Sequence, residues 1–258
     1  TSSVNGATAF TAQNSGTLDN SGDIVLTGTE STAVKVLGGE VGNRGNITAN
    51  GTALYVGAGD QGQASSVTNS GTVLATDGTA AINLAAGALN LVGSGVGTVE
   101  ARGTADGVLV STGATGLDVN GAHIIVNAAG ATGNGIENAA NLTDLQLTNT
   151  TIDVANGAGV RTAVTIDKTN SGLITVSGNG EGIAFENADG SATTGNLDLS
   201  GSSGLTINVT GAGGTGIYAN TTGTVDTAAY VTVGNAAGGP ALKLGSGVTS
   251  ATNRGILE

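Results

Sequence analysis

Pairs of apolar residues separated by one position recur along this chain, each preceded by a small residue such as Gly or Ala. The mean step between the first members of successive pairs is 26 residues. Internal repeats of roughly 20–50 residues are typical of solenoids, propellers and arrays, in which one structural unit is stacked many times. The pairs are Val34/Val36, Leu54/Val56, Ile82/Leu84, Val108/Val110, Ile136/Asn138, Val164/Ile166, Ile183/Phe185, Ile217/Ala219 and Leu242/Leu244.

Each repeat contains an earlier pair with the same spacing of two, which is the period of a β-strand. Examples are Ile47/Ala49, Ile124/Val126 and Ile207/Val209. A third, weaker series includes Leu89/Leu91 and Leu145/Leu147, and Gly-containing turns separate the series. Three short strands in about 26 residues predict one coil of a parallel β-helix, and nine to ten coils give a rod on the order of 45 Å long.

Composition supports strands over helices. The chain of 258 residues holds 47 Gly and one Pro, and each Gly in a helix interior costs roughly 0.8–1 kcal/mol. Val, Ile and Thr favour the pleated surface of a sheet. The five aromatic residues and the absence of Trp and Met indicate a narrow interior filled by small branched side chains.

The net charge of −12 disfavours binding to phosphate backbones and anionic membrane surfaces. No apolar run approaches the roughly 20 residues that span a bilayer. We therefore expect neither a nucleic-acid partner nor insertion of this segment into a membrane.

The phrase Asn-Ser/Arg-Gly recurs at the start of several repeats. Stacking of coils would align these residues, so we expect the asparagines to form a ladder at a turn. The positions are Asn20, Asn43, Asn69, Asn170 and Asn253.

Three segments resemble passenger domains of type V, monomeric autotransporter adhesins of Gram-negative bacteria: Thr68–Val73, Asp77–Leu84 and Gly213–Asn220. The resemblance covers nearly the whole chain, although its motifs are of low complexity. It implies a right-handed, single-stranded parallel β-helix, a Sec signal peptide and a C-terminal outer-membrane barrel. Because the last two are absent from the sequence, we expect residues 1–258 to be a single β-helix passenger fragment. The whole protein is then anchored at the cell surface through that barrel, or secreted.

No residue pattern predicts catalysis or metal binding. The single histidine, His123, stands at a predicted strand entry, where a turn residue with a satisfied ring is the simpler interpretation. Ser202 and Ser203 lack the spacing of a nucleophile elbow. The absence of Cys and of an Asp-rich loop removes the usual zinc and calcium patterns. Asp144, Asp153 and Asp167 do not share a strand position, so the sequence predicts no enzyme activity, no cofactor and no metal site.

The residues between the second apolar pairs should point outward and form a line along one face. Tyr is favoured at interfaces and at surfaces that stack on sugars, although scattered exposed apolar groups are also ordinary. The candidate ligand or self-association face consists of Lys35, Tyr55, Asn83, Leu109, Glu137, Thr165, Tyr218 and Lys243.

Three functions are compatible with these features. The first is a cell-surface adhesin that binds copies of itself on neighbouring cells, supporting aggregation and biofilm formation, or binds a host matrix protein or glycan. The second is an inert stalk that presents another domain, and the third is a polysaccharide-degrading β-helix enzyme. Irregular steps mark where loops shrink or grow, and the longest step, Ile183 to Ile217, predicts a protruding loop.

Overall fold

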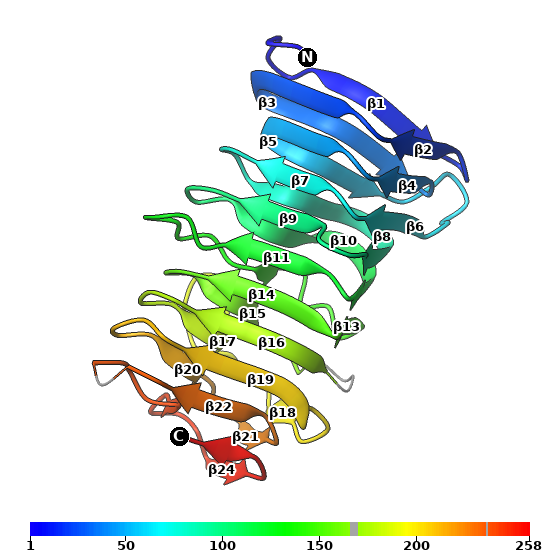
Figure 1. The fold of residues 1–258 in the computed structure, drawn as a ribbon. Coiled ribbons are helices and arrows are strands. Elements are labelled where there is room, and N and C mark those ends of the chain that lie inside the picture. The colour runs from blue at the N-terminus through cyan, green and yellow to red at the C-terminus, as the bar shows by residue number, and fades with distance from the viewer. Residues whose placement is uncertain (166–169, 236) are drawn as a thin grey trace.

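The chain forms a β-solenoid of about nine coils, in which all paired strands run parallel. The computed structural model describes residues 1–165, 170–235 and 237–258. No helix occurs among those residues. The two termini lie at opposite ends of the stack (Figure 1). The all-β parallel architecture predicted from the apolar pairs is confirmed.

Each coil has three sides, and some strands bend around a corner and serve two of them. The first side consists of the beginnings of β3 (Asp23–Leu37) and β5 (Asn46–Gly57), then β7 (Thr72–Ala75), β9 (Thr98–Ala101), β11 (His123–Val126), β14 (Thr150–Val154), β16 (Ser171–Val176), β19 (Gly204–Val209), β22 (Tyr230–Val233) and β25 (Ile256–Leu257).

The second side follows the first in every coil. It consists of β1 (Thr8–Gln13), the ends of β3 and β5, the beginnings of β8 (Ala80–Gly93) and β10 (Asp106–Asn120), and then β12 (Ile136–Asn138), β15 (Ala158–Thr162), β17 (Glu181–Phe185), β20 (Thr215–Ala219) and β23 (Leu242–Leu244).

The third side closes the coil. It consists of β2 (Thr17–Asn20), β4 (Glu40–Asn43), β6 (Ser65–Asn69), the ends of β8 and β10, β13 (Leu145–Thr148), β18 (Leu197–Leu199), β21 (Thr224–Thr227) and β24 (Ser250–Asn253).

The core is a set of columns that run along the axis. In the second-side column, Val34 pairs with Leu54, which pairs with Ile82, and all three are fully buried. Parallel pairing in register puts the same position of every coil in line. The inward pairs predicted from the sequence therefore occupy continuous apolar columns, with one exception.

The exception is the pair Val164/Ile166. Ile136 pairs with Val160, and Val160 pairs with Ile183, so the inward residues of this coil are Val160 and Thr162. The successive steps become 24 and 23 residues, in place of the 28 and 19 that the pair Val164/Ile166 gives. Ile166 lies outside the described residues.

A polar interior explains why the pattern of apolar pairs missed this coil. Thr162 is buried and its hydroxyl accepts a hydrogen bond of 3.1 Å from Asn138 Nδ2. Asn138 Nδ2 also donates to the Leu142 carbonyl, and the Leu142 amide donates to Asn138 Oδ1, at 2.9 Å each. Two polar residues can occupy the core here because each has its partners inside.

The long step between Ile183 and Ile217 contains an exposed loop after β17. Residues 188–192 are exposed, and Asn187 closes the loop by donating from Nδ2 to the Ser191 hydroxyl at 2.9 Å and to the Ala192 carbonyl at 3.0 Å. The extra length of this repeat thus lies where the side chains face solvent.

The small residue that precedes each second-side pair has a steric reason. At Gly135, a β carbon would lie 2.3 Å from Cγ2 of Ile152 on the first side. Gly107, Gly159, Gly182 and Gly216 meet a β-branched first-side residue in the same way. These glycines let the second side approach the first more closely than any larger residue would allow.

The predicted asparagine ladder forms in the N-terminal coils. Asn20 Nδ2 donates to Asn43 Oδ1 at 2.8 Å, and Asn43 Nδ2 donates to Asn69 Oδ1 at 2.8 Å. All three are buried. Asn170 is also buried and accepts a hydrogen bond from the Leu147 amide, whereas Asn253 is exposed in the last coil.

Candidate functional site

The outward residues of the second side form one line along the rod, which we call the second-side ladder. Register pairing connects them rung by rung, and all lie at the same position of their strands. The ladder consists of Lys35, Tyr55, Asn83, Leu109, Glu137, Arg161, Ala184, Tyr218 and Lys243.

One member of the predicted face, Thr165, does not belong to this ladder. Arg161 takes its rung, between Glu137 and Ala184. The Thr165 hydroxyl instead donates to the Asn196 carbonyl and accepts a 3.1 Å hydrogen bond from the Asp198 amide, at the start of β18 on the third side. The other seven predicted residues occupy ladder positions, but Glu137, which was expected to be exposed, is buried.

A lysine and a tyrosine pair near each end of the ladder. Lys35 Nζ lies 5.9 Å from the centre of the Tyr55 ring, and Lys243 Nζ lies 4.6 Å from that of Tyr218. Cation–π attraction orients each pair. Six steps between adjacent strands lead from Tyr55 to Tyr218, which corresponds to roughly 29 Å.

The middle of the ladder holds a partly buried ionic cluster around Arg161. Its Nε lies 3.9 Å from Glu137 Oε2 and 3.6 Å from Glu186 Oε1. Glu137 and Glu186 are buried, while about a quarter of the Arg161 side chain is exposed. Glu137 Oε2 also accepts a 2.7 Å hydrogen bond from Asn134 Nδ2.

Two further carboxylates extend this cluster at the corner that leads into the second side. Asp106 accepts a 2.7 Å hydrogen bond from the Asn134 amide. Glu181 lies three coils beyond Asp106 and is in register with Ala158, whose amide donates to Asn134 Oδ1 at 2.8 Å. Contacts between successive coils, rather than neighbours in sequence, bring these groups together.

Burial controls the protonation of the cluster. It raises the pKa of the Glu137 carboxyl to about 7, a rise that the positive charge of Arg161 offsets only in part. It also raises the pKa of Asp106 to about 6, where hydrogen bonds from Asn134 and, to a smaller extent, the charge of Arg161 oppose the rise. Burial also raises the pKa of Glu181, and the neighbouring Glu186 charge adds to the rise. The centre of the ladder therefore changes charge near neutral pH.

Arg161, Asp106 and Glu186 were not predicted from the sequence as members of this face. For Arg161 a signal was present, since Gly159 precedes Val160 as the small residue precedes every other second-side pair. Asp106 and Glu186 lie outside the strand positions that the apolar pattern marks. They reach the cluster because of the direction the chain takes at the corners between strands.

His123 lies on the first side, not on this ladder, and has a partner there. Its Nε2 lies 2.7 Å from Asp153 Oδ2 in the next coil, and both side chains are partly exposed. Asp144 instead lines a shallow hollow of about 230 Å³ on the third side with Asp118, Asn90 and Gln146. Asp144 and Asp153 are thus on different sides, and Asp167 lies outside the described residues.

In chemical terms the ladder offers aromatic faces, cationic groups and an amide in a row. Three of the seven basic residues of a chain with net charge −12 lie on it. Among the described residues, no group of three or more His, Asp or Glu side chains could hold a metal ion. The described residues also include no helix of the length and hydropathy needed to cross a membrane.

Comparison with known proteins gives the chain no relative: no family model, curated protein or solved structure matches it.

Proposed function

We propose that this protein is an adhesive rod of a bacterial cell surface, which binds a glycan chain or a glycosylated matrix protein along the second-side ladder. The observation that carries the proposal is the pair of Lys–Tyr contacts, Lys35 with Tyr55 and Lys243 with Tyr218, set along one straight line of side chains.

The geometry favours a ligand that is itself extended. Tyr rings provide flat apolar surface with a polar edge, which suits stacking on sugar rings. The half-buried Asn83 rung between the tyrosines adds an amide that can hydrogen-bond to hydroxyls. Each contact of this kind is weak, but several contacts to one chain act together because the later ones form at high effective concentration.

The direct test is binding of the purified chain to glycan arrays and to immobilised matrix proteins. We expect the double variant Tyr55→Ala/Tyr218→Ala to lose at least tenfold in affinity for whichever ligand the parent protein binds. Tyr230→Ala is the matched control, because Tyr230 lies on the first side. Equal binding by the double variant and the parent would show that the second-side ladder is not the binding surface.

Self-association on neighbouring cells is the other form of adhesion to test. Cells that display the chain should settle faster than cells without it, and the double tyrosine variant should abolish the difference if the ladder contacts a second rod. Settling that is lost in the double variant while glycan binding is absent would favour adhesion between copies of the protein.

The alternative is a stalk that holds another domain away from the cell. It is favoured by the apolar columns, which run through the described coils with only local polar substitution. A stalk binds nothing by itself, and its length matters more than its surface. Removal of whole coils from the protein on cells would then impair function, whereas ladder variants would not.

A further inference from the structure

The two lysines of the second-side ladder have no carboxylate partner. Arg44, Arg161 and Arg254 each lie within 4 Å of an Asp or Glu oxygen. Among the described residues, no carboxylate oxygen lies that close to Lys35 Nζ or Lys243 Nζ, and each ammonium group lies near a tyrosine ring instead. In a chain with 19 acidic and seven basic residues, these two groups are left for an anionic ligand.

Uncharged residues surround the Lys35–Tyr55 pair. The neighbouring partly exposed residues of the same two strands are Thr32, Leu37 and Thr52. The next rung of the ladder is the amide of Asn83. This part of the second side is therefore a locally positive region on an acidic protein, and such a region attracts anionic groups.

The two Lys–Tyr pairs occur in opposite order along the ladder. Lys35 precedes Tyr55, whereas Tyr218 precedes Lys243, so the tyrosines lie inside and the lysines outside. Eight steps between adjacent strands lead from one lysine to the other, which corresponds to roughly 38 Å. One extended ligand that reaches both pairs thus has to follow the whole ladder.

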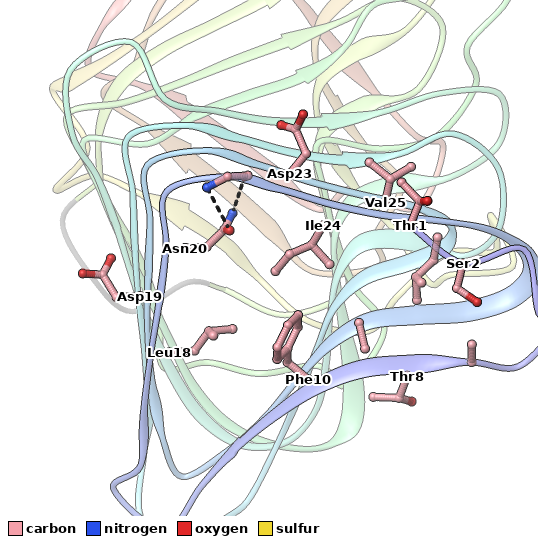
Figure 2. A pocket seen from close by; sticks show the side chains of 14 residues that line it. Thr1, Ser2, Thr8, Phe10, Leu18, Asp19, Asn20, Asp23, Ile24 and Val25 are labelled. Atoms are coloured by element: carbon pink, nitrogen blue, oxygen red, sulfur yellow. Dashed lines mark hydrogen bonds between the residues drawn. The ribbon is translucent and has the colours of Figure 1, made fainter.

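Two hollows elsewhere in the described residues are less suited to an acidic ligand. The larger, of about 490 Å³ in the N-terminal coils, has Phe10 on its wall together with Asp19 and Asp23, and no Lys or Arg side chain lines it (Figure 2). The hollow on the third side includes Asp118 and likewise no basic side chain. The ladder is therefore the better surface for a carboxylate.

The charge of the chain limits how anionic the ligand can be. A densely sulfated polymer would bring many charges against a protein of net charge −12 and be repelled. A glycan with carboxylates on an otherwise neutral chain brings few. Its carboxylates can accept charge-assisted hydrogen bonds from the lysines, while its sugar rings stack on the tyrosines.

The acidic cluster lies midway between the two rings. Glu137 is three steps from Tyr55 and three steps from Tyr218. Although it is buried, Glu137 occupies an outward rung. Its charge therefore lies beneath the path of any chain that contacts both tyrosines.

The charged groups at this centre come from four consecutive levels of the second side: Asp106 in β10, Glu137 in β12, Arg161 in β15, and Glu181 and Glu186 in or directly after β17. When all are ionised, four negative charges and one positive charge give the centre a net charge of −3. Burial raises the pKa of Glu137 to about 7 and that of Asp106 to about 6. Protonation of both carboxyl groups leaves −1, so repulsion of an anionic chain weakens as pH falls from 8 to 5.5.

We propose that the second-side ladder binds glycans that carry carboxylates without sulfates, and that it binds them more tightly in mildly acidic solution. This ligand class rests on the proposed function, because it refines what the same ladder binds. Lys35 and Lys243 bind carboxylates of the glycan, and the two tyrosines stack on its sugars. The ionised centre around Glu137 opposes binding at higher pH.

The test uses hyaluronate, which has a carboxylate on every second sugar and no sulfate, and its carboxyl-reduced, neutral form. The affinity of the purified chain for each is measured at pH 8 and pH 5.5 at one ionic strength. We expect the affinity for hyaluronate to rise on the order of fivefold at pH 5.5, because its own carboxylates stay ionised there. The affinity for the neutral form should stay constant, and heparin, which is densely sulfated, should bind more weakly than hyaluronate.

The double variant Asp106→Asn/Glu137→Gln tests the role of the centre. It should bind hyaluronate at pH 8 as tightly as the parent does at pH 5.5, and its affinity at pH 5.5 should equal the parent's. Glu40→Gln/Asp118→Asn is the matched control, because it removes the same charge at exposed positions of the third side, and it should keep the parent's pH dependence. A parent-like pH dependence in the central variant would overturn the regulation.

The lysines are tested one at a time. Lys35→Gln and Lys243→Gln should each lower the affinity for hyaluronate on the order of threefold and leave that for the neutral form unchanged. Arg102→Gln is the matched control, since Arg102 is exposed at the end of the first-side strand β9, and it should bind hyaluronate like the parent. Equal losses in all three variants would overturn specific recognition of carboxylates by the ladder.

The outcomes separate this inference from the proposed function. If neutral glycans bind along the ladder and hyaluronate does not, the acidic ligand class is wrong and the proposed function stands. If heparin binds more tightly than hyaluronate, the ligand class is also wrong. If no glycan binds at either pH, acidic or neutral, both are wrong.

Discussion

Gly135 at the entry to the second side lies against Ile152 on the first side so closely that a β carbon would come within 2.3 Å of Ile152 Cγ2. The same β carbon would lie 2.5 Å from the Gly159 carbonyl oxygen in the next coil. This corner therefore has no space for a β carbon, and packing requires Gly there.

Gly135→Ala should lower the free energy of unfolding by about 1–3 kcal/mol, the usual cost of overpacking a filled core. Denaturant unfolding followed by circular dichroism measures the loss. Gly22→Ala is the matched control, because a β carbon at Gly22 meets no atom within 4 Å. The double variant Gly135→Ala/Ile152→Ala should lose less than the sum of the two single changes, and strict additivity would contradict the steric explanation.

The asparagine ladder gives a second prediction. Asn43→Ala removes the acceptor of Asn20 Nδ2 and the donor to Asn69 Oδ1. Asn20 Nδ2 keeps its hydrogen bond to the Gly22 carbonyl, but the buried Asn69 Oδ1 loses its Asn43 donor. Leaving a buried polar group without a partner costs roughly 1–3 kcal/mol, so the N-terminal coils should open more readily. Amide hydrogen exchange should show the loss of protection in β2, β4 and β6. The control is Asn90→Ala, an exposed third-side change that should leave hydrogen exchange unaltered. Equal effects of the two changes on exchange would show that the asparagine ladder does not stabilise the N-terminal coils.

The carboxyl of Glu137 makes stability depend on pH. Its pKa of about 7 in the folded chain exceeds its ordinary value of 4.5, so the folded state holds a proton that the unfolded state has released between these values. The free energy of unfolding should therefore fall as pH rises from about 4.5 to above 7, by an amount on the order of 3 kcal/mol. Asp106, whose pKa is about 6 in place of 3.8, adds a fall that begins at lower pH.

Glu137→Gln checks the origin of this dependence. The amide keeps an oxygen that can accept from Asn134 Nδ2 but carries no charge, so the variant should be more stable than the parent above pH 7 and equal to it near pH 4. Urea unfolding at several pH values measures the profile. Glu40→Gln, at an exposed position, should leave the profile unchanged, and a Glu137→Gln profile as steep as the parent's would contradict the assignment.

Arg161 should matter most when the carboxylates around it are charged. Arg161→Met removes the guanidinium that lies within 4 Å of Glu137 and Glu186. Breaking a buried ion pair from one side costs up to about 3–5 kcal/mol, and the partial exposure of Arg161 reduces this figure. We expect a loss of about 2 kcal/mol at pH 8 and a smaller loss at pH 5, measured by urea unfolding, with the exposed Arg102→Met as control.

Much of the fold is readable in the sequence because the solenoid repeats one simple rule. Val34, Leu54 and Ile82 mark one column, and parallel pairing in register makes every coil place its equivalent residue there. The rule failed at Val160 and Thr162, since a buried Thr looks like a surface residue when only apolar pairs are counted. Its hydrogen bond with Asn138 exists only after stacking.

Part of the candidate face could be predicted from the sequence for the same reason. Lys35, Tyr55, Tyr218 and Lys243 follow from strand alternation alone. The ionic cluster did not, because Asp106 and Glu186 reach Glu137 and Arg161 from corners whose direction no periodic pattern encodes. Which charged groups at turns lie close together therefore becomes visible only in the folded structure.

The parallel pairing of every coil has a mechanical consequence. Backbone hydrogen bonds between coils run along the axis of the rod, so a pull on its two ends loads them one layer at a time instead of shearing them together. A released coil, such as the 24 residues from Ile136 to Val160, would extend by roughly 80 Å. Under tension the rod would therefore lengthen in steps and dissipate the force coil by coil, while the remaining coils stay folded.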